Sequence, residues 1–238
     1  MSGKPEKFLD HLEDLRKVLL KIIAVTLILA IPCWFLAPAA LDSLLKYAAP
    51  GEFRLHYFAL MEPFFVRLKL TALLALVLAA PWNAGQLWGF ISPGLLPKER
   101  KILALPVLVI SLLALGGAAL AAFIVTPALL RFSLSFAGEG LEPVIGIGEF
   151  TDLVLMVILA GMLLFQFPVV IYLLLKLGIV QVETIRNKRP LLIVLIFTAA
   201  AVFSPPDAFS QIALAIPTWL LLELSLWLFA RRGRYPAE

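Results

Sequence analysis

Three carboxylates, Glu13, Asp14 and Glu99, could together bind a positively charged ligand. Glu99 lies in a short polar interruption, residues 90–101, whose two prolines and one glycine restrict the backbone and should hold the side chain in place. Arginine suits such an acceptor, because its planar guanidinium donates two parallel hydrogen bonds to a carboxylate. A purely structural reading stays open, in which Glu13 pairs with Lys17 one helical turn on and Glu99 pairs with a neighbouring basic residue.

Four polar or acidic residues near or within apolar stretches are candidates for a second contact surface. Gln166 falls near the middle of an apolar run, where an unpaired amide is costly and a partner helix is expected. That partner is either another helix of this chain or a second membrane protein. Ser210 and Gln211 are expected to cap a helix or to extend the same polar patch. Glu223 is expected to form a structural ion pair or to lie at an interface.

The remaining chemistry-bearing residues argue against catalysis. Cys33 is the only cysteine, and His11 and His56 have no companions at ligand spacing, so no metal site or cofactor is expected. No nucleophile with an adjacent base, no phosphate-binding loop and no HExxH pattern occurs in the sequence. The chain is therefore not expected to be an enzyme or to bind nucleic acid.

The composition predicts an integral membrane protein. Of the 238 residues, 62% are hydrophobic and only 15% are charged, which is too apolar for an ordinary soluble domain. No removable signal peptide is expected, because the first residues lead into mixed charge. No polar stretch is longer than a loop, so we predict a single membrane domain over residues 1–238.

The apolar runs predict an all-α polytopic protein with six transmembrane helices. Their approximate bounds are 18–41, 64–91, 102–127, 152–176, 190–204 and 208–229. An amphipathic N-terminal helix is expected to run straight into the first span. The fifth and sixth helices are expected to be short and to form a hairpin that crosses thinned lipid, with a sharp turn that ends at Asp207.

Proline and glycine predict where these spans bend, end or pack. Pro32 and Pro38 should kink or fray the far half of the first span, which is expected to give way to a polar and aromatic connection over residues 42–62. Thr126-Pro127 should close the third helix. Gly85 and Gly89 form a small-xxx-small pair that could let another helix approach closely.

Basic residues are distributed unevenly between the two sides of this predicted bundle. Fifteen of the twenty fall on the side that carries both termini, and only three fall on the other side, with Arg67 and Lys69 left in the second span and expected to reach the headgroups. Because lysine and arginine favour the cytoplasmic side, both termini are predicted to be cytoplasmic. Glu13, Asp14 and Glu99 would then share that face.

Several motifs, in order along the chain, make the sequence resemble the TatC family, the multispanning subunit of the twin-arginine protein translocase. They are His11-Leu-Glu-Asp-Leu-Arg16, Pro63-Phe-Phe with Lys69, Phe90 with Pro93-Gly-Leu95 and Glu99-Arg100, Phe165-Gln-Phe-Pro168, Lys188-Arg-Pro190, Ser204-Pro-Pro-Asp-Ala-Phe-Ser-Gln211 and Leu214-Ala-Ile-Pro217. The resemblance covers almost the whole chain.

The resemblance implies a six-span, glove-shaped receptor in the cytoplasmic (inner) membrane. Such a receptor binds signal peptides with paired arginines and, in an oligomeric complex with single-span TatA- and TatB-like partners, exports folded proteins at the expense of the proton-motive force. It implies that Asp14 and Glu99 accept the arginines, with Phe90 and Arg100 close by. It also implies that partner helices dock at Gln166.

The sequence departs from the family pattern at two of these positions. Aspartate stands at position 14, where glutamate is usual, so the shorter side chain could shift part of the binding to Glu13. Gln166 stands where glutamate is common, so the docking contact at this position has to be a neutral hydrogen bond and not a charged one.

Two other classes of membrane protein are alternatives. A secondary transporter for a small solute would use ionisable groups within the membrane and related broken helices. This sequence has almost no charge at that depth and no visible internal repeat. An intramembrane protease would need serine and histidine, or paired aspartates, at membrane depth, and neither set is present.

Overall fold

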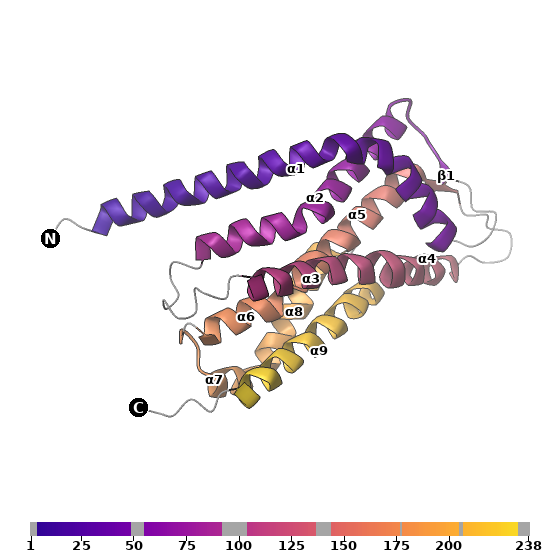
Figure 1. Ribbon diagram of the computed structural model, residues 1–238. Helices are drawn as coiled ribbons and strands as arrows, with labels where there is room; N and C mark the ends of the chain where they lie inside the picture. The colour runs from indigo at the N-terminus through magenta and orange to yellow at the C-terminus, as the bar shows by residue number, and fades with distance from the viewer. Residues whose placement is uncertain are drawn as a thin grey trace.

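The computed structural model describes residues 4–48, 55–91, 104–136, 144–176, 178–204 and 207–232. Helix α1 (Lys4–Ala48) is continuous from the amphipathic segment into the first span, as predicted. It bends in its C-terminal part, as expected for a helix that contains Pro32 and Pro38 (Figure 1). The helix continues seven residues beyond the predicted end, so the expected polar connection over residues 42–62 is wrong in its first part.

Helix α2 (Glu62–Ile91) packs along α1 and runs in the opposite direction (Figure 1). The next helical stretch has three parts, α3 (Ala104–Leu120), a π-helical turn η2 (Ala121–Val125) and α4 (Thr126–Leu134). The prediction that Thr126-Pro127 closes this helix is therefore wrong.

The π-helical turn explains why the proline does not end the helix. Pro127 has no amide hydrogen to donate back along the helix, and its ring crowds the preceding turn. The wider turn η2 falls directly before it, and both the amide and the hydroxyl of Thr126 donate to the carbonyl of Ala121, the hydroxyl over 2.9 Å.

A small parallel sheet joins two connections that are distant in the sequence. Strand β1 (Leu55–His56) pairs with β2 (Ile145–Gly146), with Leu55 opposite Ile145. Helix α5 (Ile147–Leu164) begins directly after β2, and α6 (Phe167–Lys176) continues it after a break at Phe165 and Gln166. The sheet was not predicted from the sequence, because two-residue strands leave no periodic pattern.

The C-terminal part consists of a short helix α7 (Val182–Asn187) and the hairpin of α8 (Arg189–Phe203) and α9 (Ala208–Arg232). Helix α8 has 15 residues and is about 22 Å long, which is short for a membrane span, as predicted. Helix α9 has 25 residues, so the prediction of a short sixth helix is wrong. The predicted bounds of this helix, 208–229, already include Glu223, and the observed helix extends slightly beyond them.

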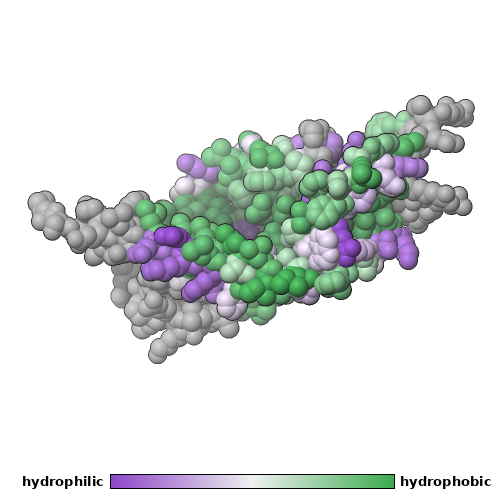
Figure 2. Space-filling view, turned by 90° about the horizontal axis from the view of Figure 1, so that it is seen from above, coloured by the Kyte–Doolittle hydropathy of each residue, from purple (hydrophilic) through white to green (hydrophobic). Residues whose placement is uncertain are grey.

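Five helical stretches of the described residues are long and apolar enough to cross a membrane, and α8 is a sixth, shorter apolar helix. The protein is thus a helical polytopic membrane protein, while the count of six crossings stays a prediction. An apolar band covers the middle of the molecule, and hydrophilic residues gather toward its two ends (Figure 2).

The helices align so that the molecule has two chemically different ends (Figure 1). We call one the sheet end: it carries β1, β2, the beginnings of α2 and α5, and α4. We call the other the basic end: it carries the N-terminal half of α1, the C-terminal ends of α2, α6 and α9, and α7. The described basic residues at this end are Lys4, Lys7, Arg16, Lys17, Lys21, Lys176, Arg186, Lys188, Arg189, Arg231 and Arg232.

A close helix crossing joins α3 to α5. An added Cβ at Gly117 would overlap the carbonyl of Gly161, and one at Gly161 would overlap the carbonyl of Gly117. Only glycine fits there, because the two backbones are in contact. The predicted pair behaves differently: a Cβ at Gly85 would lie 3.9 Å from Val107, and one at Gly89 would meet no described atom within 4 Å. The close approach predicted there is wrong.

Candidate functional site

Two of the predicted carboxylates lie exposed on α1 at the basic end. Asp14 pairs with Lys17 over 3.6 Å, and the two side chains remain 65% and 61% exposed. Within the described part of the chain Glu13 makes no ion pair, so the alternative pairing of Glu13 with Lys17 is wrong. A weak surface pair and an exposed neighbour leave carboxylate oxygens available to an incoming cation.

The loop that would complete this site follows α2. Phe90 is half-buried in the last turn of α2, at the same end of the molecule as Asp14 (Figure 1). Glu99 and Arg100 lie outside the described residues. The joint action of Asp14 and Glu99 on one ligand therefore stays a prediction.

Gln166 lies at the break between α5 and α6, where it hydrogen-bonds within the chain. Its Nε2 donates to the carbonyl of Ile110 in α3 and to that of Met162 in α5, each over 3.4 Å. This is the internal bond that the sequence left as an alternative to a docking role. Both bonds are long and the residue is only half-buried, so docking of a partner helix there stays a prediction.

The polar residues at the start of α9 close the α8–α9 hairpin. Asp207 caps α9, because its Oδ1 accepts the amide of Ser210 over 2.7 Å and its Oδ2 accepts the Ser210 hydroxyl over 2.6 Å. Ser210 is fully buried. Gln211 donates from Nε2 to the carbonyl of Phe197 in α8 over 2.8 Å. Both residues thus have structural roles, and their expected part in partner docking has no support in these contacts.

Glu223 forms the ion pair that was one of its two predicted roles. Its Oε2 accepts a hydrogen bond from Arg189 Nη2 over 2.8 Å, which ties the beginning of α8 to the last third of α9. The Glu223 side chain is 27% exposed, so the pair is partly shielded from solvent.

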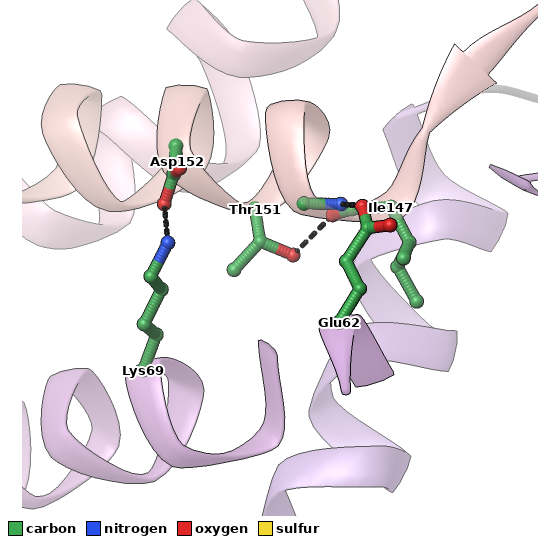
Figure 3. A network of polar contacts seen from close by, with 6 residues as sticks. Glu62, Lys69, Ile147, Thr151 and Asp152 are labelled. Carbon is green, nitrogen blue, oxygen red and sulfur yellow. Dashed lines mark hydrogen bonds and ion pairs between the residues drawn. The ribbon is translucent and has the colours of Figure 1, made fainter. Parts of the chain in front are cut away.

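A polar network at the sheet end was missed from the sequence (Figure 3). The Glu62 carboxylate accepts three backbone amides: Phe58 over 2.7 Å and Ala59 over 3.1 Å in its own connection, and Gly148 over 2.8 Å at the start of α5. An acidic residue in the first helical turn, directly before Pro63, is a helix-start signal that could have found Glu62. Its partner at position 148 could not be found in this way.

Two basic residues of α2 bind groups of the same chain, and their predicted contact with the headgroups stays a prediction. Lys69 forms an ion pair with Asp152 of α5 over 2.5 Å (Figure 3). Arg67 donates from Nε to the carbonyl of Trp34 over 3.1 Å, and its guanidinium lies 4.5 Å from the centre of the Trp34 ring. Together these contacts join α2 to α5 and α1.

The two ends therefore offer different chemistry to a ligand. At the sheet end the carboxylates of Glu62 and Asp152 are occupied by donors of the same chain. At the basic end Glu13 and Asp14 are exposed among many basic side chains. Asp14 can exchange its weak ion pair with Lys17 for a cationic group of a ligand. Among the described residues no group of three or more His, Cys, Asp or Glu could hold a metal ion.

The family model described as Sec-independent protein translocase protein (TatC) matches residues 10–217. The chain is 36% identical to a Sec-independent protein translocase protein TatC of Azotobacter chroococcum over 240 residues, which covers 97% of this chain and 94% of the relative. It is also 36% identical to the protein of that name from Escherichia coli K12, over 98% of this chain and 93% of the relative.

Two solved structures have the same fold. Both are crystal structures of a twin-arginine translocase receptor, TatC, and both are 30% identical to this chain. One, in the detergent DDM, has a TM-score of 0.81 over 92% of this chain and 98% of the other. The second has a TM-score of 0.80 over 94% of this chain and all of the other.

Proposed function

Because the chain belongs to the TatC family of Sec-independent protein translocase proteins, we propose that it is the receptor subunit of a twin-arginine translocase. In this role it binds the twin-arginine signal peptides of folded cargo proteins and takes part in their export. It does so by binding and positioning, with no covalent step. The observation that carries the proposal is the likeness to a twin-arginine translocase receptor over 92% of the chain.

The basic end is the signal-binding face in this proposal. Asp14, with Glu13 beside it, accepts the guanidinium groups of the signal peptide together with Glu99, while Phe90 and Arg100 line the same loop. Each arginine can donate two parallel hydrogen bonds to a carboxylate, which a lysine ammonium cannot do. The exposure of Glu13 and Asp14 supports this role, because neither has to give up a strong internal partner.

The basic end faces the cytoplasm of an inner-membrane protein in this proposal. The described parts of this end carry eleven lysines and arginines, whereas four described basic residues lie toward the sheet end: Lys46, Arg67, Lys69 and Arg131. Basic residues are retained on the cytoplasmic side, so both termini are assigned to it. Signal peptides then arrive at the face that carries Asp14.

Single-span TatA- and TatB-like proteins are the proposed partners within the membrane, with Gln166 as the docking position. The long hydrogen bonds of Gln166 can be exchanged for bonds to a partner helix at little cost. Export is proposed to depend on the proton-motive force and to need no cofactor.

A peptide titration of the detergent-solubilised protein tests the receptor role. A twin-arginine peptide and its twin-lysine counterpart are titrated into the wild type and into Asp14→Ala and Glu99→Ala. We expect the arginine peptide to bind more tightly than the lysine peptide, and each variant to weaken its binding by roughly tenfold or more. Asp42→Ala is the matched control, because Asp42 is an exposed carboxylate on the opposite part of α1.

Equal affinity of the wild type for the two peptides would reject the proposed recognition of arginine. Crosslinking places the peptide independently: in a Cys33→Ala background, single cysteines near positions 14 and 99 should react with a probe on the signal arginines. A cysteine at position 42 should not react.

A further inference from the structure

We propose that the connection between β1 and α2, residues 57–61, is an interfacial membrane anchor that inserts its side chains among the lipid headgroups at the sheet end. We call it the apolar turn. Its side chains are Tyr57, Phe58, Ala59, Leu60 and Met61, and none carries a charge. Leu60 is 88% exposed, Phe58 70%, Tyr57 66% and Met61 62%. Such a run of exposed apolar residues marks an interaction surface.

The backbone of the apolar turn is prepared for an environment poor in water. The amides of Phe58 and Ala59 donate to Glu62 Oε2, over 2.7 and 3.1 Å. The carbonyl of Ala59 accepts the amide of Glu62 over 3.1 Å, and that of Met61 accepts the amide of Phe65 over 3.2 Å. Unpaired backbone groups make a loop costly to place in lipid. Four backbone groups of the apolar turn are already paired within the chain.

The charge of Glu62, which organises the turn, is also compensated within the protein. Besides the two amides of the turn, its carboxylate accepts the amide of Gly148 over 2.8 Å (Figure 3). It thus lies at the beginnings of both α2 and α5, where the helix dipoles favour a negative charge. An added Cβ at Gly148 would come within 2.6 Å of Glu62 Oε1, so the fit against α5 is close. The turn is held in position by these contacts.

The position of the turn along the chain places it at the membrane boundary. The apolar span that begins at Glu62 continues to Phe90 without a break. Phe64 and Phe65, in the first helical turn, are each about half exposed, and Phe64 contacts the ring of Trp34. Aromatic side chains at the end of a span are typical of the membrane–water interface. The turn directly precedes this belt and lies at the edge of the molecule, between β1 and α2 (Figure 1).

These observations favour lipid over a protein as the occupant. The turn presents aromatic and aliphatic side chains with no charge of its own, it continues the aromatic belt, and four of its backbone groups are hydrogen-bonded within the chain. A segment of this kind can lie in the headgroup region without spanning the bilayer.

Spin labels test this proposal with the purified chain alone in phospholipid vesicles. The label is attached at Leu60→Cys in a Cys33→Ala background, and its collisions with oxygen and with a water-soluble nickel complex are compared. Phe35→Cys, on the exposed apolar face of α1, is the reference for lipid, and Glu13→Cys, at the basic end, is the reference for water. Leu60 is so exposed that the substitution leaves the fold intact.

We expect the oxygen-to-nickel collision ratio at position 60 to lie between the two references and several-fold above that of position 13. A ratio equal to that of position 13 would overturn the proposal and identify the apolar turn as a surface for a protein partner. A second label at Met61→Cys should give the same ordering. Because no signal peptide or partner is present, the result is independent of the proposed receptor function.

Discussion

Two carboxylates of the sheet end, Glu62 and Asp152, and two of the basic end, Glu13 and Asp14, differ in how far they are engaged within the chain. At the sheet end Glu62 accepts three backbone amides and Asp152 pairs with Lys69. Two of these contacts, Gly148 to Glu62 and Lys69 to Asp152, join segments more than 80 residues apart. At the basic end the described carboxylates of α1 have one weak pair, between Asp14 and Lys17 three residues on.

This difference separates residues that hold the fold from residues that are available for binding. A carboxylate with three internal donors loses those bonds if it turns to a ligand, whereas an exposed carboxylate loses almost nothing. Substitutions of Glu62 should therefore lower stability, and substitutions of Glu13 or Asp14 should lower binding. Each prediction below compares one end with the other.

The largest effect on stability is expected from Glu62→Ala. The substitution leaves the amides of Phe58, Ala59 and Gly148 without their acceptor and uncouples α2 from α5. We expect the largest fall in melting temperature of this set, measured by thermal unfolding in detergent. Glu149→Ala is the control, because Glu149 is an exposed acid in the first turn of α5. Equal melting temperatures of the two variants would contradict the role of Glu62.

Gly148→Ala tests the same contact from the side of α5. Its new methyl group would come within 2.6 Å of Glu62 Oε1 and push the carboxylate away from the amide. A smaller fall in melting temperature is expected than for Glu62→Ala, since the other two amide bonds can persist. Gly116→Ala, whose methyl group would meet no described atom within 4 Å, should leave the melting temperature unchanged or raise it.

Asp14→Ala should separate binding from stability at the basic end. Loss of an exposed ion pair should change the free energy of unfolding by no more than about 0.5 kcal/mol. The same variant should show the loss of peptide affinity described above. Thermal unfolding and peptide titration on one preparation give both values. A large fall in melting temperature would move Asp14 to the structural group.

The ion pair of Lys69 with Asp152 should make a smaller contribution than Glu62. The side chains are 43% and 58% exposed, so solvent screens the pair and a coupling energy of about 0.5 kcal/mol is expected. A double-mutant cycle with Lys69→Met and Asp152→Asn measures this coupling. A coupling above about 2 kcal/mol would show that the surrounding lipid strengthens the pair well beyond a surface contact.

Gln166→Leu is expected to have a small effect on stability. Its two hydrogen bonds are 3.4 Å long, and hydrogen bonds within membranes contribute about 0.6 kcal/mol on average. Signal-peptide affinity should stay at the wild-type value, while crosslinking to a TatA- or TatB-like helix should fall. Unchanged crosslinking would leave Gln166 with only its internal bonds.

The bend of α1 and the turn before α9 show how far local sequence reasoning reaches. Proline positions indicated a disturbed helix in α1, and the paired prolines after Ser204 indicated the turn before α9. The same reasoning failed at Pro127, because the preceding π-helical turn removes the conflict and the helix continues. For α9 the predicted bounds, 208–229, lie close to the observed helix, although its description as short is wrong, and Glu223 pairs with Arg189.

Glycine packing shows where local reasoning stops. Gly85 and Gly89 have the spacing of a close helix contact, yet the contact lies between Gly117 and Gly161, on helices whose relative rotation the sequence does not specify. Similarly, one of the three amides that donate to Glu62, that of Gly148, lies 86 residues further along the chain. The pairing of β1 with β2 brings the two segments together.

The sequence by itself determined that this chain forms apolar helices in a membrane and carries most of its basic residues on one side. Apolar length and charge are sums over neighbouring residues, and lipid acts on each segment separately. Only the tertiary structure decided which carboxylates are engaged and which are exposed. A hydrogen bond depends on the relative position of two segments, and packing of the whole bundle sets that position.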